Sequence, residues 1–271
     1  MLFNSILSLQ CTRTELHSCT SKNSEGARNF CKLLHRTSSL VDIMSRPAAP
    51  LNPGFVAKAE KLLAHLKECV KEFEGDPTAL LAVTDKYCYE NCSMMHVGDK
   101  KGVIVWKIVN ELAPKTCLEL GTYCGYSAVL MASALPAESR YITVEAEEGS
   151  ENVARQFIKL AGADVSEKIT LIGGMSNDVI PKLREDFSVD TLDFVFIDHW
   201  KKLYLRDLKL LESHGLLRKG TVILADNVVY PGVPDYLEYV QSSEKYQTEL
   251  IHSTVEYSDI EDALAKSVYL G

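Results

Sequence analysis

From residue 115 to the C-terminus, short apolar runs alternate with longer stretches whose apolar residues recur at helical spacing. The short runs are typical of strands buried on both faces of a sheet, and five of them are TCLELG, YITVEA, ITLIGG, LDFVFID and TVILADN. The stretches between them include GYSAVLMASAL, ENVARQFIKLAG and LYLRDLKLLESHG. Strands that alternate with helices predict an α/β fold, a mostly parallel sheet with helices on both faces.

The regions on either side of this alternation have patterns of their own. Upstream, residues 54–73, 76–89 and 97–112 each carry apolar residues at the spacing of an amphipathic helix. Downstream, YQTELIHS and LAKSVYLG follow each other closely, which indicates an antiparallel pair. We therefore expect helices before the sheet and an antiparallel strand at its C-terminal end.

Residues 1–50 differ from the rest of the chain. They are rich in Ser, Thr, Arg and Lys, contain only three acidic side chains and end in RPAAPLNP. This composition favours a flexible N-terminal extension, which leaves residues 51–271 as a single domain. A mitochondrial transit peptide has a similar composition, so residues 1–45 have that alternative interpretation, and Met44 offers an alternative start.

Overall charge and apolar content exclude several classes of function. The net charge of −8 leaves no basic surplus to neutralise phosphates, so we expect no nucleic-acid partner. The same surplus of acids would tolerate a cationic ligand. No apolar run approaches the ~18 residues needed to cross a bilayer, so we expect no transmembrane segment.

The eight cysteines lack the regular spacing of a disulfide framework, so we expect reduced thiols and a cytoplasmic location. Cys88, Cys92 and His96 follow a four-residue rhythm that resembles a zinc site on one helix face. A structural zinc site requires a fourth ligand and usually closer pairs. Packing on a helix face is the alternative, and we prefer it.

Ligands of open α/β sheets bind beyond the carboxyl ends of the strands, so the residues after each strand are the first candidates for a site. The first strand ends in LELGTYCGYS, which has Gly121 and Gly125 but lacks the G-x-G-x-x-G pattern that binds a pyrophosphate. Glu119 precedes the first glycine. An acid beside loosely spaced glycines favours a ligand with positive charge and no pyrophosphate, such as S-adenosylmethionine, over NAD.

The second strand ends at Glu145. Nucleoside-binding folds place the carboxylate for the ribose hydroxyls about 20 residues beyond the glycine turn, and Glu145 stands near that distance from Gly121. A free acid at a strand end is often only a solvated residue. The register with Gly121 favours ribose binding.

Two later strands end in acids: FVFID at Asp198, and VILAD at Asp226, which Asn227 follows. If these strands are neighbours, three oxygen donors converge at one edge of the sheet. Carboxylate and amide oxygens without Cys or His favour a hard cation, and Mg²⁺ in particular. The alternative is that the two acids cap the helices that follow them.

Lys201 lies three residues beyond Asp198. A lysine is normally protonated and cannot act as a base, but a neighbouring divalent cation disfavours its charged form. We therefore expect Lys201 to be a general base. Its neighbour Lys202 is expected to face solvent.

From about Asp76 to Gly271, the chain resembles the catechol O-methyltransferase family. The stretches that carry the resemblance are HVGDKKG, LELGTYCGYSAV, VDTLDFVFIDHWK, GLLRKGTVILADNV, PGVPDYLEYV and VEY. Members of this family are small-molecule methyltransferases that use S-adenosylmethionine and Mg²⁺. The resemblance implies a Rossmann-like class I methyltransferase fold.

The resemblance also implies roles for individual residues. Asp198, Asp226 and Asn227 would hold the metal, and Lys201 would be the general base. Glu256 would accept a hydrogen bond from the second catechol hydroxyl, and Pro231 would border the aromatic ring. The residues expected to line the methyl donor are Met95, Val97, Glu119, Gly121, Tyr123, Ser127, Glu145, Ala146, Ser176, Asn177, Asp198, His199 and Trp200; Lys201, Asn227, Pro231 and Glu256 would contact the substrate.

Four positions depart from the family pattern. Ser93 stands where the family usually has a tryptophan that forms one wall of the substrate cleft, which leaves selectivity for the aromatic ring open. Ala146 replaces a larger apolar residue under the adenine, and Asn177 replaces a glutamine beside it. Val255 is slightly smaller than the usual leucine.

The leading hypothesis is a cytoplasmic, monomeric catechol O-methyltransferase that acts on a small-molecule catechol. One alternative is a relative that methylates other vicinal dihydroxy or phenolic substrates. Another is a methyltransferase-like scaffold that acts through protein interaction, but a scaffold would not need the metal and base residues. Membrane-bound forms of the family carry an N-terminal anchor helix, and residues 1–50 contain no such apolar segment.

Overall fold

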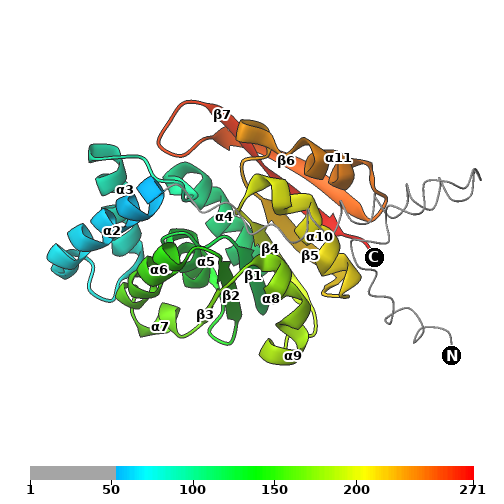
Figure 1. The fold of residues 1–271 in the computed structure, drawn as a ribbon, viewed down its shortest axis with the longest axis horizontal. Coiled ribbons are helices and arrows are strands. Elements are labelled where there is room, and N and C mark those ends of the chain that lie inside the picture. Colours follow the sequence, from blue (N-terminus) through cyan, green and yellow to red (C-terminus); the bar gives the residue numbers. More distant parts are fainter. Residues whose placement is uncertain (1–52) are drawn as a thin grey trace, which may run out of the picture. The chain divides into compact units, whose positions relative to one another are not determined.

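Seven strands form one sheet in the order β3-β2-β1-β4-β5-β7-β6 (Figure 1). The computed structural model describes residues 53–271, so the predicted N-terminal extension and transit peptide lie outside the described residues. The strands are β1 (Thr116–Leu120), β2 (Arg140–Glu145), β3 (Ile169–Gly173), β4 (Leu192–Ile197), β5 (Leu217–Ala225), β6 (Tyr246–Thr254) and β7 (Glu261–Tyr269).

The first five strands are parallel, and β7 pairs antiparallel with both β5 and β6. The prediction of a mostly parallel sheet with an antiparallel C-terminal pair is therefore confirmed. β5 begins at Leu217, four residues before the predicted run TVILADN. The polar segment Arg218–Gly220 conceals this start in the sequence, and a register irregularity accompanies it opposite β4.

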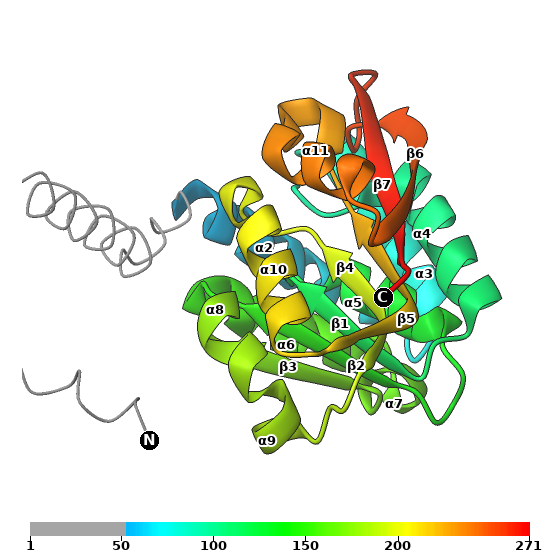
Figure 2. The ribbon, with the colours of Figure 1, turned by 90° about the vertical axis from the view of Figure 1, so that its right-hand side faces the viewer.

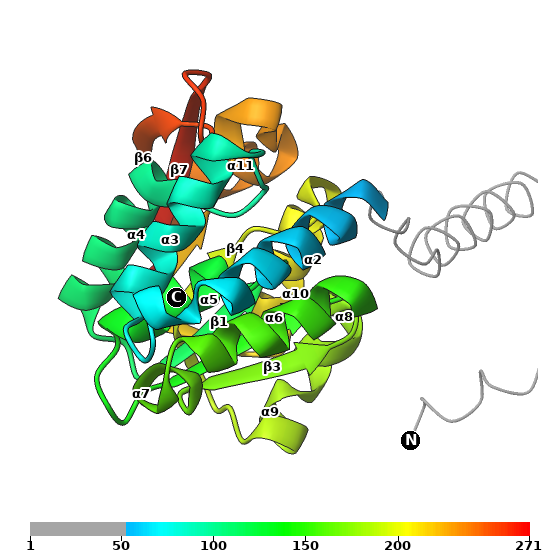
Figure 3. The ribbon, with the colours of Figure 1, turned by 90° about the vertical axis from the view of Figure 1, so that its left-hand side faces the viewer.

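Helices cover both faces of the sheet. Figures 2 and 3 show α2 to α7 on one face and α8 to α11 on the other. The first set comprises α2 (Pro53–Glu68), α3 (Pro77–Glu90), α4 (Gly98–Leu112), α5 (Tyr126–Ala134), α6 (Glu148–Leu160) and α7 (Ala163–Ser166). The second comprises α8 (Ser176–Val179), α9 (Leu183–Phe187), α10 (Tyr204–Ser213) and α11 (Pro234–Ser242). Short turns of 3₁₀ helix occur at η2 (Val70–Glu72), η3 (Ile180–Lys182) and η4 (Lys201–Leu203), and a π turn at η5 (Val228–Gly232).

The alternation of side chains along β4 explains the continuous apolar sequence of this strand. Phe194 and Phe196 pack into the core beneath α2 to α7, whereas Val195 and Ile197 pack into the core beneath α8 to α11. Successive side chains of a strand point to opposite faces. A strand covered on both sides must therefore be apolar at every position.

Local sequence signals define the start of α3. Asp76 caps α3, since its carboxylate accepts hydrogen bonds from the backbone amides of Thr78 at 2.9 Å and Ala79 at 3.2 Å. Pro77 occupies the first turn, where its missing amide hydrogen costs nothing.

Among residues 53–271, no helix has both the length and the apolar character that a bilayer crossing requires.

The strand order places a crevice between β1 and β4. The chain continues from β1 to β2 on one side and later adds β4 on the other side. Such a reversal of direction leaves the two following turns apart at the carboxyl end of the sheet, and ligands bind there. The turns after β1, β2, β4 and β5 therefore form the candidate site.

Candidate active site

The turn after β1 lies directly against the turn after β4. Gly121 has φ +99°, and a Cβ atom at this position would lie 2.5 Å from the backbone oxygen of Asp198. Only glycine combines this backbone conformation with so close an approach. The glycine predicted to approach a ligand thus also permits contact between the two turns.

Glu145 ends β2 and holds the turn after β1. Its Oε2 accepts hydrogen bonds from the backbone amides of Thr122 at 3.1 Å and Tyr123 at 2.7 Å, and its Oε1 accepts one from Glu147 at 2.9 Å. Burial raises the pKa of the Glu145 carboxyl, and these backbone donors oppose that shift. Oε2 thus accepts two hydrogen bonds, whereas Oε1 accepts one and retains a lone pair for a ribose hydroxyl.

Glu119 is fully buried within β1. The hydroxyl of Thr143 donates to its Oε2 at 2.5 Å, whereas Oε1 has no hydrogen-bond partner among residues 53–271. Burial raises the pKa of this carboxyl to about 8, so it carries a proton at neutral pH. Pairing of Glu119 with a cationic ligand stays a prediction, and it would require that proton to leave.

Asp207 of α10 joins two residues expected to line the methyl donor. Its Oδ2 lies 2.6 Å from His199 Nε2 and accepts the Ser176 hydroxyl at 2.5 Å, and its Oδ1 accepts Arg206 Nε at 2.7 Å. Burial lowers the pKa of His199, which keeps the imidazole neutral, although Asp207 opposes the shift. The structure thus brings Ser176 and His199 together through a fully buried acid that the sequence reasoning did not identify.

Lys201 joins the ends of β4 and β5. Its Nζ donates to Asp198 Oδ1 at 3.0 Å, to Asn227 Oδ1 at 2.8 Å and to the Tyr204 hydroxyl at 2.7 Å. Burial raises the pKa of Asp198, an effect that the Lys201 ammonium opposes. Two of the predicted metal ligands and the predicted base are therefore in direct contact.

Asp226, the third predicted metal ligand, has a different partner. Both of its carboxylate oxygens accept hydrogen bonds from Lys101 Nζ, at 2.7 and 2.8 Å. The same ammonium lies 3.2 Å from Asp262 Oδ2 and 3.6 Å from Glu256 Oε2. The predicted hydroxyl acceptor Glu256 is thereby placed beside the predicted metal ligands.

The sequence analysis did not identify Lys101 or Asp262 as site residues. For Lys101 the sequence contains a signal, which is its position on the apolar stripe of a helix. Helix α4 buries Gly98, Lys101, Val105 and Val109, which follow one another at helical spacing. A charged side chain on the buried stripe of a helix needs internal partners. The identity of those partners required the fold, because Asp226 and Asp262 are more than 120 residues away in sequence.

The remaining predicted positions surround these contacts. Val97, Tyr123 and Ser127 are buried. Met95 and Trp200 are 41% and 46% exposed. Ala146 and Pro231 are also exposed, and Asn177 is half-buried, with its amide donating to Asp178 Oδ1 at 3.0 Å.

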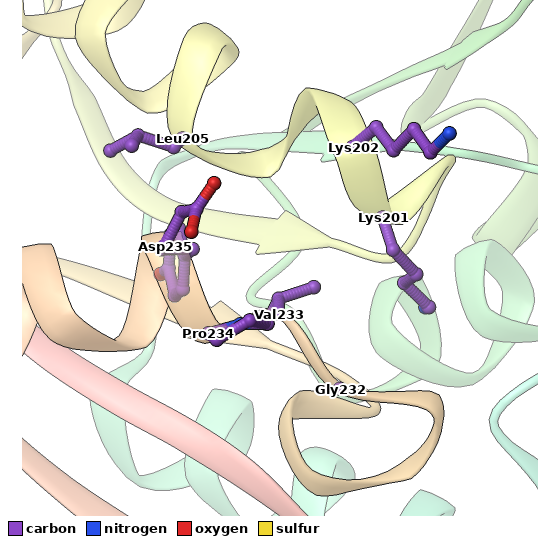
Figure 4. Close-up of a pocket in the computed structure, with 8 residues that line it drawn as sticks. Lys201, Lys202, Leu205, Gly232, Val233, Pro234 and Asp235 are labelled. Carbon is purple, nitrogen blue, oxygen red and sulfur yellow. The ribbon is translucent and has the colours of Figure 1, made fainter.

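A pocket of about 160 Å³ opens beside Lys201 (Figure 4). Its lining comes from η4 and the start of α10, and from the end of η5 and the start of α11: Lys201, Lys202, Leu205, Gly232, Val233, Pro234, Asp235 and Tyr236. Figure 4 shows the side chains of Lys201 and Lys202 diverging from their adjacent backbone positions. Lys202 Nζ instead lies 5.9 Å from the ring centre of Trp200.

Cys88 and His96, two members of the four-residue rhythm, pack against each other and against Tyr126. Cys88 Sγ lies 3.5 Å from His96 Nε2, and the His96 ring stacks on Tyr126 at 4.0 Å between ring centres. His96 Nδ1 accepts the backbone amide of Gly98 at 3.2 Å. Within residues 53–271, no group of three or more His, Cys, Asp or Glu side chains is arranged to hold a metal ion. The predicted magnesium ligands are two acids and one amide, so they do not form a group of that kind.

The fold defines an α/β protein of the Rossmann-like class, with a candidate ligand site at the switch point of its sheet. The family model described as O-methyltransferase matches residues 73–255, and the chain belongs to this family. The catechol O-methyltransferase B of Danio rerio is 48% identical over 214 residues, which cover 79% of this chain and 80% of that protein. The catechol O-methyltransferase of Bos taurus is 45% identical over 215 residues, which cover 79% and 78%.

Solved structures of the same class share the fold. An O-methyltransferase from Bacillus cereus, in complex with SAH, superposes with a TM-score of 0.62 at 22% identity. The match covers 78% of this chain and 99% of that one. The expected resemblance to the catechol O-methyltransferase family and the expected class of fold are confirmed.

Proposed function

We propose that the chain transfers a methyl group from S-adenosylmethionine to one hydroxyl of a catechol, with Lys201 as general base. Mg²⁺ would be held by Asp198, Asp226 and Asn227. The observation that carries the proposal is the meeting of the turns after β4 and β5. Asp198 Oδ1 and Asn227 Oδ1 both face the same ammonium nitrogen, so oxygen donors from two strands already converge on a cation.

The charges of the site also fit a divalent ion. Six charged side chains form two groups here: Lys201 pairs with Asp198, and Lys101 pairs with Asp226, Glu256 and Asp262. With every acid ionised, four carboxylates and two ammonium groups leave two negative charges in a poorly solvated region. One divalent cation would neutralise them. The donors are oxygens throughout, as Mg²⁺ prefers.

The metal ligands, Lys201 and Glu256 would each have a part in the reaction. Bound to these oxygens, Mg²⁺ would stabilise the anionic form of the catechol. Lys201, once neutral, accepts the proton of one hydroxyl, while Glu256 accepts a hydrogen bond from the other. The deprotonated oxygen bonds to the methyl carbon as the sulfur–methyl bond breaks, which leaves S-adenosylhomocysteine. Much of the acceleration would come from the alignment of the two substrates.

The methyl donor would lie in the crevice between β1 and β4. Glu145 would accept a ribose hydroxyl, and Ser176 and His199, which Asp207 joins, would border the adenine. The Danio rerio and Bos taurus relatives support a catechol as the acceptor. The Bacillus cereus complex with SAH supports the methyl donor.

One feature supports a broader substrate range. Ser93 stands where the family usually has a tryptophan wall; it is exposed, and its carbonyl accepts a hydrogen bond from Lys58 Nζ at 3.1 Å. A small residue at this position leaves the ring less enclosed. Other vicinal dihydroxy compounds are therefore the second candidate substrates.

A methyl-transfer assay over catechols and monophenols, with and without Mg²⁺, tests the proposal. Substrates with two adjacent hydroxyls should react only when Mg²⁺ is present, and monophenols should stay unreactive. Equal turnover of monophenols, or turnover in the presence of a chelator, would contradict the proposed mechanism. Turnover of non-aromatic vicinal diols would favour the second candidate.

A further inference from the structure

Lys101 is an ammonium group inside the protein core. Its side chain is completely buried, and it rises from the first turn of α4 into a group of three carboxylates. Two of them, Asp226 and Asp262, are equally buried. Nothing in the proposed reaction uses Lys101 directly.

Asp262, at the start of β7, connects Lys101 to Asn227 and to the turn that precedes Pro231. Its Oδ2 accepts Asn227 Nδ2 at 2.9 Å in addition to Lys101. Its Oδ1 accepts the backbone amides of Val229 at 3.2 Å and Tyr230 at 2.9 Å. The turn that these amides fix leads directly into Pro231, the residue expected to border the ring.

We infer that Lys101 and Asp262 form a positioning pair that sets the geometry of the metal and catechol half of the site. The inference rests on the proposed function. Lys101 orients Asp226 and Glu256, and Asp262 orients Asn227 and the turn before Pro231. Neither residue would touch a substrate or the reacting atoms.

Stability alone does not account for this pair. A buried ion pair repays its desolvation only partly, and well-packed apolar residues in its place are often as stable or more stable. The other buried residues of α4 are Gly98, Gly102, Val105 and Val109, none of them polar, so an apolar side chain at Lys101 would suit the helix. The pair links α4 to β7, to the end of β5 and to the turn at Glu256. The proposed reaction requires these elements to keep fixed positions relative to one another.

The methyl-donor half of the site is held by separate contacts. Glu145 fixes the turn after β1, and Asp207 fixes Ser176 and His199; none of the hydrogen bonds described for these groups involves Lys101 or Asp262. Loss of the pair should therefore disturb one half of the site and leave the other half intact. This asymmetry distinguishes a positioning role from a general structural one.

The test compares Lys101→Met, Lys101→Arg and Asp262→Asn with the wild-type chain. Lys100→Met is the matched control, since Lys100 is the adjacent lysine, is 47% exposed and pairs with Asp259 on the surface. Three quantities are measured: the affinity for S-adenosylhomocysteine by calorimetry, the affinity for Mn²⁺ by electron paramagnetic resonance, and KM for catechol. Circular dichroism establishes whether each variant is folded.

We expect Lys101→Met and Asp262→Asn to weaken Mn²⁺ binding by about 10–100-fold, as loss of groups that orient metal ligands commonly does. Lys101→Met also removes a positive charge, which by itself would strengthen cation binding. Weaker binding by this variant therefore identifies a loss of orientation. KM for catechol should rise similarly, while S-adenosylhomocysteine affinity stays at the wild-type level. Lys101→Arg should fall between, because it retains the charge in a different shape. Lys100→Met should match the wild-type chain in all three measurements.

Two results would overturn the inference. One is unchanged Mn²⁺ affinity and KM in folded Asp262→Asn and Lys101→Met. The other is a parallel loss of S-adenosylhomocysteine binding, or failure of all three variants to fold while Lys100→Met folds, either of which makes the pair a general structural element. Failure of the proposed function is recognised separately, since the wild-type chain would then fail to bind S-adenosylhomocysteine or to methylate catechol.

Discussion

Lys201 Nζ donates a hydrogen bond to Asn227 Oδ1 at 2.8 Å. The two residues follow neighbouring parallel strands, β4 and β5, whose register pairs Ile197 with Ala225. Each lies just beyond that pair, so the sheet itself brings the amine and the amide oxygen together. The pairing of β4 with β5 therefore makes the proposed base and a proposed metal ligand neighbours.

Lys201→Ala removes the proposed base and leaves the crevice for the methyl donor intact. We expect turnover to fall by about 10²–10⁴-fold, the usual contribution of a general base, with S-adenosylhomocysteine affinity nearly unchanged. Steady-state kinetics and calorimetry measure the two quantities. Lys202→Ala serves as the control and should retain both. Equal loss of turnover and of binding would give Lys201 a structural role instead.

Glu119→Gln should change how stability depends on pH. Burial raises the pKa of Glu119 from 4.5 to about 8 in the folded protein, so the folded state retains a proton that the unfolded state loses. Stability of the wild-type chain therefore falls as pH rises from about 4.5 to about 8, by a few kcal/mol as an order of magnitude. Glutamine carries no charge at any pH and should remove this contribution.

Denaturant unfolding at pH 5 and pH 8 measures the effect. The variant should gain stability relative to the wild-type chain at pH 8, and the difference should be smaller at pH 5. Glu111→Gln, at a side chain that is 65% exposed, is the control and should leave the slope unchanged. An identical pH dependence in wild type and Glu119→Gln would show that burial does not hold the proton on this acid.

Gly121→Ala should destabilise the fold more than an ordinary substitution at positive φ. The left-handed backbone costs a non-glycine residue roughly 1–2 kcal/mol, and here the new Cβ would also lie 2.5 Å from the Asp198 backbone oxygen. Overpacking of this kind adds about 1–3 kcal/mol. Gly75→Ala separates the two effects, since Gly75 has φ +76° and nothing within 4 Å of the new Cβ.

The free energy of unfolding of both glycine variants is the measurement. Gly75→Ala should show the backbone cost alone, and Gly121→Ala should show both costs together with reduced turnover. Equal destabilisation of the two variants would mean that the turns after β1 and β4 separate easily. The crevice would then be more adaptable than the contact implies.

Much of the fold could be read from the sequence, because the physical signals are local. The apolar run of β4 and the Asp-Pro-Thr start of α3 correspond closely to the observed elements. The start of β5 could not be read, since Arg218–Gly220 is exposed although it belongs to the strand. Short helices such as α8 and α9, of four and five residues, carry too few positions to display a period.

The candidate site was predictable where its residues follow strands, and hidden where they do not. Asp198, Asn227 and Glu145 stand at strand ends, which chain topology gathers at one edge. Lys101 and Asp207 lie within helices, and only their burial and their partners reveal them. The sequence could not show that Asp226 binds Lys101, because the two residues are 125 positions apart.

Addition of Mg²⁺ to chelator-treated protein is the most direct test of the central claim, that Asp198, Asp226 and Asn227 hold a divalent ion beside Lys201. Catechol methylation and Mn²⁺ binding are followed together for wild type and Asp226→Asn. Chelation should stop turnover, Mg²⁺ should restore it, and one Mn²⁺ should bind per chain, with much weaker binding in Asp226→Asn. Full turnover in excess chelator, or undiminished ion binding by that variant, would contradict the claim.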